Sequence, residues 1–165
     1  MGNAVNINTR VGFGYDLHKL IKKRKLMLGG MEIPSKVGED GYSDGDVLIH
    51  AIIDAMLGAL CKGDIGTHFP TGNKEYKDIS SRILLKKTAQ LLKEEGCRIV
   101  NIDSTVILQR PKLVPYIGKI KQKLSNVLEL GVEHISVKAK TGEGIGLVGK
   151  CRAIEAYAVV LVQRI

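Results

Sequence analysis

The residues whose types and spacing most clearly suggest chemistry are an aspartate and a histidine two positions apart, Asp16 and His18. They lie in the segment RVGFGYDLH, where they alternate with Tyr15 and Leu17. Because side chains alternate between the two faces of a β-strand, a strand here projects Asp16 and His18 from one face. A carboxylate and an imidazole at that separation can bind a single metal ion. Taken alone, such a pair is more often a surface acid beside a surface histidine.

A second histidine, His50, lies in an apolar segment that predicts a helix over about residues 44–61. It stands one helical turn after Asp46 and one turn before Asp54. A histidine in such a helix needs a partner, so it is either a core-edge residue bonded to an acid or a third metal ligand beside the aspartate–histidine pair. Three protein ligands with an open fourth position are typical of catalytic zinc. Asp46 and Asp54 are then candidates to orient the ligands.

The glycine-rich segment TGEGIG, residues 141–146, is a candidate phosphate-binding loop. It does not match a dinucleotide-binding fingerprint, because the residues after it predict a strand rather than a helix. We interpret it as a turn whose backbone N–H groups and Thr141 hydroxyl hold phosphate. Glu143 is available there to bind a hard cation such as Mg2+.

The elements that must position these residues follow from periodicity and turn chemistry. Extended segments are expected at 10–18, 25–34, 98–108, 134–141 and 151–165, helices at 44–61, 78–96 and 115–131, and a polar loop at 63–77. Strands alternating with helices indicate an α/β (α+β) sandwich, with a mixed four-stranded sheet covered by helices on one face.

Finer features of the helices are also predicted. Ser43 or Asp44 is the expected N-cap of the first helix, with Asp46 in its first turn. In the second helix we expect four residues to face the core, namely Ile83, Leu84, Leu91 and Leu92.

Length and composition are those of one globular domain. The chain has 165 residues, of which 44% are hydrophobic and 25% charged, and its longest apolar runs are far too short to span a bilayer. The opening MGNAVNINTR carries no export or myristoylation signal. Three cysteines without a C-x-x-C pair, Cys61, Cys97 and Cys151, suit reduced thiols and are expected to be small core residues. These features predict a soluble cytoplasmic protein.

A formal net charge of +8 is compatible with nucleic acid, an anionic membrane surface or a small polyphosphate as partner. The lysines are dispersed over several segments, and the chain has no Trp, two Phe and five Tyr. That leaves few aromatic rings on which nucleic-acid bases could stack. The excess charge therefore favours neither nucleic acid nor membrane.

Five separated motifs occur in one order across nearly the whole chain: GFGYDLH, SDGDV..H, GDIGTHFP, QRPKL.P and KTGEGIGLVGK. In these the sequence resembles the 2-C-methyl-D-erythritol 2,4-cyclodiphosphate synthase family of the non-mevalonate isoprenoid pathway. The resemblance implies a lyase that acts on 4-diphosphocytidyl-2-C-methyl-D-erythritol 2-phosphate. The 2-phosphate attacks the β-phosphorus, CMP leaves, and the cyclic diphosphate remains. Such a transfer requires mainly positioning and charge neutralisation.

The resemblance also implies ligand sites. One Zn2+ or another divalent transition metal per subunit falls on Asp16, His18 and His50, and Mg2+ or Mn2+ falls on Glu143 with the substrate diphosphate. Tyr42 and Thr141 fall beside the reacting phosphates. The implied substrate contacts are Asp16, His18, Tyr42, Ser43, Asp64, Ile65, Gly66, Phe69, Pro70, Thr71, Gly72, Asn73, Leu108, Gln109, Arg110, Pro111, Lys112, Leu113, Val114, Lys140, Thr141, Gly142, Glu143, Leu147 and Lys150. A homotrimer with active sites between subunits is implied too, the 108–114 turn forming the cytidine pocket.

The sequence departs from the family pattern at four of these positions. Tyr42 replaces a usual histidine, and Lys140 stands where threonine is frequent and supplies an ammonium that can compensate. Leu147 and Lys150 replace Phe and Arg around the family's central trimer cavity. Two other functions stay open at this point. One is a low-activity family member that senses cytidine nucleotide and metal, and the other is a basic nucleic-acid-binding module.

Overall fold

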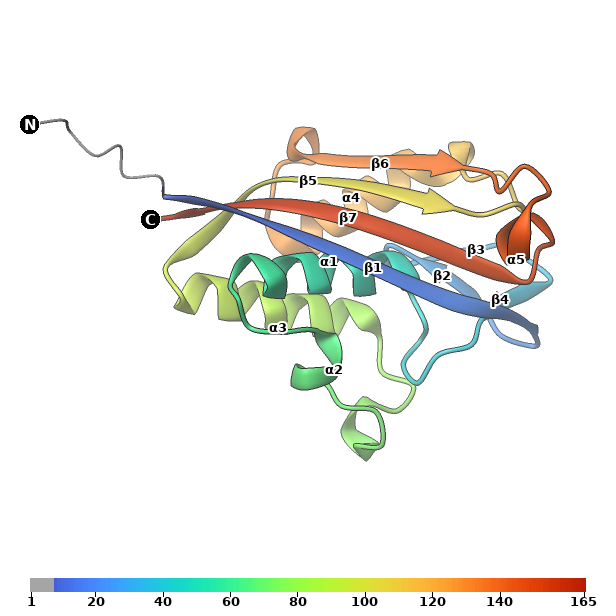
Figure 1. Ribbon diagram of the computed structural model, residues 1–165, viewed down its shortest axis with the longest axis horizontal. Coiled ribbons are helices and arrows are strands. Elements are labelled where there is room, and N and C mark those ends of the chain that lie inside the picture. Colours follow the sequence, from blue (N-terminus) through green and yellow to red (C-terminus); the bar gives the residue numbers. More distant parts are fainter. Residues whose placement is uncertain (1–7) are drawn as a thin grey trace, which may run out of the picture.

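The computed structural model describes residues 8–165, so the expectation drawn from the first residues of the chain lies outside the described range. One mixed sheet carries the fold (Figure 1), and its strands follow the order β4 (Val37–Glu39), β1 (Thr9–Lys22), β7 (Ala153–Arg164), β5 (Cys97–Ile107) and β6 (Ile135–Lys140). Among the strands of residues 8–165, only β5 and β6 pair in parallel. A separate hairpin is formed by β2 (Leu26–Leu28) and β3 (Met31–Ile33).

The expected fold class is confirmed, with one correction to the number of strands. The sheet has five strands rather than four, because the three-residue β4 pairs with the end of β1. A segment of three residues is too short to show the alternation by which strands are recognised in a sequence.

Three helices cover one face of the sheet: α1 (Val47–Ala59), α3 (Ser81–Glu94) and α4 (Ile117–Leu128). Short helices α2 (Ile65–His68) and α5 (Gly146–Gly149) interrupt the two long loops, and single 3-10 turns occupy Lys74–Tyr76, Val114–Tyr116 and Val132–His134. Helix α1 is central, since it contacts both β1 and β7 on one side and α3 on the other. Among residues 8–165, no helix combines the length and the apolar character that a membrane span requires.

Two glycines of β1 allow α1 to lie directly on the strand. A Cβ built at Gly12 would stand 1.8 Å from the carbonyl oxygen of Ala55, and one built at Gly14 would stand 1.9 Å from that of Ala51. No real side chain can occupy such a position. The glycines therefore set the spacing between the strand that carries Asp16 and the helix that carries His50.

The N-terminus of α1 differs from the prediction, because Asp46 is the N-cap rather than Ser43 or Asp44. Its carboxylate accepts a hydrogen bond from the Ile49 N–H at 3.0 Å. It also accepts from Gly29 N–H at 2.9 Å and Gly30 N–H at 2.6 Å, the two residues that turn between β2 and β3. One buried carboxylate thus satisfies a helix start and a hairpin turn together, which sequence spacing cannot reveal.

Three other expectations about burial are corrected. Cys97 is buried as predicted, but Cys61 and Cys151 are exposed. Each of these two cysteines stands just after a helix and has a positive φ, 57° at Cys61 and 56° at Cys151. The chain turns away from the core at these positions. In α3, Leu84 and Leu92 are buried as expected, Leu91 is half-buried, and Ile83 is 48% exposed. Leu85 lies in the core instead of Ile83.

The face of the sheet opposite the helices presents apolar side chains to the surface. Val11, Phe13, Tyr15 and Leu17 of β1 are between 42% and 66% exposed. Tyr157 of β7 packs against Tyr15 with the rings tilted by 39° and their centroids 4.9 Å apart. The predicted alternation is confirmed, because Asp16 and His18 point to the helix side. An apolar patch of this kind marks a binding or assembly surface.

Candidate metal centre and substrate pocket

Three side chains expected to bind a metal ion converge where α1 crosses β1. The Oδ2 atom of Asp16 lies 2.7 Å from Nε2 of His18 and 2.9 Å from Nδ1 of His50. The two imidazole nitrogens lie 3.2 Å apart. Ligands bonded at about 2.0–2.2 Å to one tetrahedral ion stand roughly 3.3 Å from one another. Two of the three observed separations are clearly shorter than this, so the donors would move slightly apart to hold a zinc-like divalent ion, with one coordination position left open.

The outer nitrogens of both histidines are held by hydrogen bonds that fix the ring orientation. The Nδ1 of His18 lies 3.0 Å from the carbonyl oxygen of Asp40, so it must donate there. The Nε2 of His50 lies 3.0 Å from the Ser81 hydroxyl, which donates its own proton to the Asp44 carboxylate. Ser81 can then only accept from His50. The inner nitrogens are left with lone pairs for a metal ion.

These supporting residues differ from the predicted ones. Asp46 caps α1, and Asp54 accepts from the N–H of Ile65 at 2.7 Å, so neither bonds a histidine of the site. The Ser81 hydroxyl and the Asp40 carbonyl bond the two histidine rings instead, and Asp44 accepts in turn from Ser81; none of these roles was predicted. The sequence offered little signal, because Ser81 lies in the first turn of the predicted 78–96 helix, where serine is common. Its complete burial is seen only in the structure.

The pKa shifts in the cluster favour an ionised Asp16 beside a protonated His18. Burial, the largest influence, would raise the pKa of Asp16, but hydrogen bonds and charge from His18 and His50 outweigh it and lower the pKa. Burial would lower the pKa of His18, but the hydrogen bond and charge of Asp16 raise it above its ordinary 6.5. Without metal, the site is therefore an ion pair at mildly acidic pH.

The thermal stability of the protein is expected to depend on pH, in opposite directions without and with bound metal. The His18 contribution to stability is complete below its unfolded pKa and is lost as pH rises through the raised folded pKa. The Asp16 contribution is present above its unfolded pKa and is lost as pH falls through the lowered folded pKa. Metal-free protein is therefore expected to melt at lower temperature as pH rises from about 6 to 8.

Metal-loaded protein should show the opposite trend over that range, because metal must compete with protons for the imidazoles. Thermal melts with and without chelator measure both trends. Parallel curves would contradict the assignment. A His18→Gln variant should flatten the pH dependence of the metal-free melt, because it removes the titrating partner of Asp16.

The three ligands open into a pocket of about 210 Å³. Six expected substrate contacts line it with them: Tyr42, Ser43, Ile65, Gly66, Phe69 and Thr71. Tyr76 and Leu84 complete the wall and were not predicted. The Tyr42 hydroxyl donates to the Asn73 carbonyl at 3.0 Å, so this tyrosine ties the pocket to the 63–77 loop.

That loop is built by its own polar side chains. Asp64 caps α2 by accepting from the N–H of Thr67 at 2.8 Å, and the Asn73 side chain accepts from the N–H of Glu75 at 3.0 Å. Phe69 packs edge-on against Tyr76, with centroids 5.5 Å apart. Pro70 and Gly72 lie in the exposed part between them. The loop thus forms one wall of the metal-site pocket.

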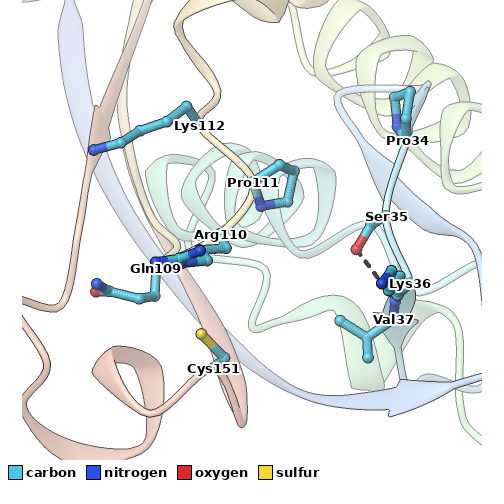
Figure 2. A pocket seen from close by; sticks show the side chains of 9 residues that line it. All are labelled: Pro34, Ser35, Lys36, Val37, Gln109, Arg110, Pro111, Lys112 and Cys151. Carbon is cyan, nitrogen blue, oxygen red and sulfur yellow. Dashed lines mark hydrogen bonds between the residues drawn. The ribbon is translucent and has the colours of Figure 1, made fainter.

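The turn after β5 forms a second, larger pocket of about 790 Å³. Figure 2 shows Gln109, Arg110, Pro111 and Lys112 on one side of it and the 34–37 segment on the other, with Cys151 below. Of the flanking expected contacts, Leu108 and Leu113 are buried in the core and can offer only backbone atoms, while Val114 is 77% exposed.

The expected phosphate loop lies at the end of β6, beside this second pocket. Leu108 N–H donates to the Lys140 carbonyl at 3.0 Å. The Thr141 hydroxyl donates to the Glu143 carboxylate, which brings the two predicted phosphate-site residues together. Gly142 packs so closely on Gly149 that an added Cβ would stand 2.5 Å from its nitrogen. Lys140, Leu147 and Lys150 are exposed around the loop.

The two halves of the predicted site are separate within one chain. Strands β7 and β5 lie between β1 and β6, so His18 and Lys140 are three strand spacings apart, roughly 14 Å. No residue of the 108–114 turn or the 140–143 loop lines the metal pocket. Tyr42 and Thr141, the expected catalytic pair, are therefore not brought together by a single copy.

Fold and site together define a class: a small α+β protein with an Asp-His-His group, able to hold a metal ion, between a sheet and its central helix. The YgbB family model matches residues 9–163. Two relatives named 2-C-methyl-D-erythritol 2,4-cyclodiphosphate synthase are similar over most of the chain. That of Syntrophomonas wolfei is 51% identical over 94% of this chain and 99% of its own length, and that of Fusobacterium nucleatum is 52% identical over 94% and 97%.

A solved structure described as IspF of Plasmodium falciparum in complex with CDP has a TM-score of 0.83 and 37% identity, covering 96% of this chain and 97% of that one. The chain belongs to the YgbB family.

Proposed function

We propose that the protein converts 4-diphosphocytidyl-2-C-methyl-D-erythritol 2-phosphate to 2-C-methyl-D-erythritol 2,4-cyclodiphosphate with release of CMP, in the non-mevalonate isoprenoid pathway. The observation that carries the proposal is the convergence of Asp16, His18 and His50 on one point in an open pocket. Relatives at about half identity carry the name of this activity, and a structural neighbour is a complex with CDP.

The metal site would orient the phosphate that is attacked. Asp16, His18 and His50 would hold Zn2+ or another divalent transition metal, which supplies Lewis-acid polarisation of a phosphate oxygen. Asp16 compensates half of the ion's charge, and Asp40 and Ser81 keep the imidazoles turned inward. Ser43 on the pocket wall would offer its hydroxyl to a phosphate oxygen, and Tyr42 would do so once its hydroxyl leaves the Asn73 carbonyl.

The β6 loop would hold the other end of the diphosphate. Thr141 would donate to a phosphate oxygen once its present partner, Glu143, turns to a Mg2+ or Mn2+ bound with substrate. Lys140 and Lys112 add positive charge where the phosphates gather. The 108–114 turn offers backbone atoms and the exposed stems of Arg110 and Lys112 to the cytidine. These roles position and neutralise charge, which is what a phosphoryl transfer requires.

A homotrimer would join the two halves of the site. Within one chain the metal pocket and the β6 loop are separate, whereas a neighbouring copy docked on the uncovered sheet face could bring its own β6 loop to the metal pocket. That face is apolar, with Val11, Phe13 and Leu17 exposed. Burying these side chains between copies would favour assembly at this face.

Placing a charge on this face tests the assembly. Phe13→Asp is expected to shift the protein from trimer to monomer in analytical ultracentrifugation and to abolish CMP release while circular dichroism stays unchanged, because the buried carboxylate would be unpaired. Ile165→Asp, also exposed, serves as a control for added charge. A trimeric, active Phe13→Asp protein would contradict this arrangement.

The direct test of function is to follow CMP release from the cytidyl substrate with metal-loaded protein and Mg2+. Release that disappears with chelator and returns with Zn2+ is expected. Binding of CDP without any CMP release would instead favour the nucleotide-sensing alternative.

We also propose a cytoplasmic location, because Cys61, Cys97 and Cys151 are all free thiols.

A further inference from the structure

An arginine outside the substrate pocket bonds the loop that carries the metal site's supporting groups, alongside backbone hydrogen bonds that join Asp40, Tyr42 and Asp44 to other segments. Arg24 lies in the turn between β1 and β2. Its guanidinium donates to three alternate backbone carbonyls: Nε to Glu39 at 3.2 Å, Nη2 to Gly41 at 3.0 Å and Nη2 to Ser43 at 2.9 Å. Nη1 also reaches the Asp78 carboxylate at 3.4 Å, so the side chain is bonded on every nitrogen.

The segment held in this way, residues 40–46, has no strand or helix of its own. It nevertheless supplies three groups of the site. The Asp40 carbonyl orients His18 at 3.0 Å, the Ser43 hydroxyl lies 3.1 Å from Nε2 of His50, and Tyr42 forms part of the pocket wall. A loop that must place three groups needs bonds other than a backbone ladder.

The loop also packs directly on a metal ligand. A Cβ added at Gly41 would stand 3.0 Å from Cε1 and 3.2 Å from Nδ1 of the His18 ring. The Gly41 carbonyl is one of the three that Arg24 binds. A shift of this backbone would therefore move the His18 ring or leave a gap beside it.

We propose that Arg24 is a positioning residue of the metal centre, acting through the 39–43 backbone on His18 and His50. Its side chain is 30% exposed, so it is only partly shielded, but the arrangement uses the planar fork of a guanidinium. Four acceptors spread around one plane match its fixed donors, whereas an ammonium can serve only those near one point. Lysine is therefore not an adequate substitute at this position.

The test is a cobalt titration of metal-free protein, followed by visible absorption. Arg24→Ala and Arg24→Lys are both expected to bind Co2+ about tenfold more weakly and to show altered ligand-field bands, as changes that disturb ligand orientation do. Lys25→Met is the matched control, because it removes one positive charge from the same turn and breaks only a surface pair with Glu32. It should bind like the wild type.

Rescue adds a readout that a merely structural role would not move. Millimolar guanidinium should restore Co2+ affinity to Arg24→Ala, while equal NaCl should not. Wild-type Co2+ affinity together with wild-type ligand-field bands in both Arg24 variants would overturn the proposal. If Arg24→Ala does not fold, the result for Arg24→Lys decides alone. The expected effect of Arg24 on the rate of CMP release rests on the proposed function, whereas its expected effect on metal binding does not. Absent CMP release in the wild type would reject that function and leave the cobalt result standing.

Discussion

Replacing His50 by alanine is expected to leave a folded protein that binds no zinc and releases CMP roughly 10³-fold more slowly. The metal's stabilisation of transition-state charge is worth several kcal/mol, and each 1.36 kcal/mol is about tenfold in rate. His50 is the one ligand that α1 contributes, so its loss leaves Asp16 and His18 as an incomplete pair on β1. Metal content after dialysis and the rate of CMP release measure the two effects.

The control for this variant is His134→Ala. His134 is exposed and pairs only with Glu133 on the surface, so its loss should change neither quantity. A His50→Ala protein that keeps one equivalent of zinc per subunit would show that the ion is held elsewhere. A protein that loses zinc but keeps its rate would show that the metal is structural.

Gly14→Ala is expected to lower the free energy of unfolding by about 3 kcal/mol, because overpacking a close backbone contact forces the helix off the strand. The new methyl group would meet the Ala51 carbonyl at 1.9 Å. Helix α1 carries His50 and β1 carries the other two ligands, so zinc affinity should fall together with stability. Urea unfolding with and without zinc measures both quantities in one variant.

Gly118→Ala is the matched control, since no atom lies within 4 Å of its added Cβ in α4. It is expected to raise the free energy of unfolding by about 0.5–1 kcal/mol through helix propensity and a less flexible unfolded chain. If Gly14→Ala were as harmless as Gly118→Ala, the close packing of α1 on β1 would be wrong.

The parts of the site that follow a local period could be predicted from the sequence. Asp16 and His18 are two residues apart on one strand, so their common direction depends on that strand alone. His50 required a further inference, that its helix packs on the same face of the sheet. The five-motif resemblance and the alternation of strands and helices likewise determined the family and fold class.

What could not be predicted depends on contacts between distant segments. Ser81 orients His50 across 31 residues, and Arg24 reaches Ser43 across 19. The choice of Asp46 as N-cap was likewise decided by the Gly29–Gly30 turn, although Ser43 and Asp44 were equally suitable by local chemistry. Local propensity cannot say which of several capping residues will meet a partner from elsewhere.

The metal ligands also join parts of the chain that are far apart in sequence, since Asp16 and His50 are separated by 34 residues. An ion bound to both acts as a reversible cross-link, and it stabilises the native state by mass action in proportion to the logarithm of its free concentration. A chain synthesised when metal is scarce would therefore be unfolded more often as well as inactive. Because proteases act on that unfolded fraction, the metal supply of the cell would set the lifetime of the protein.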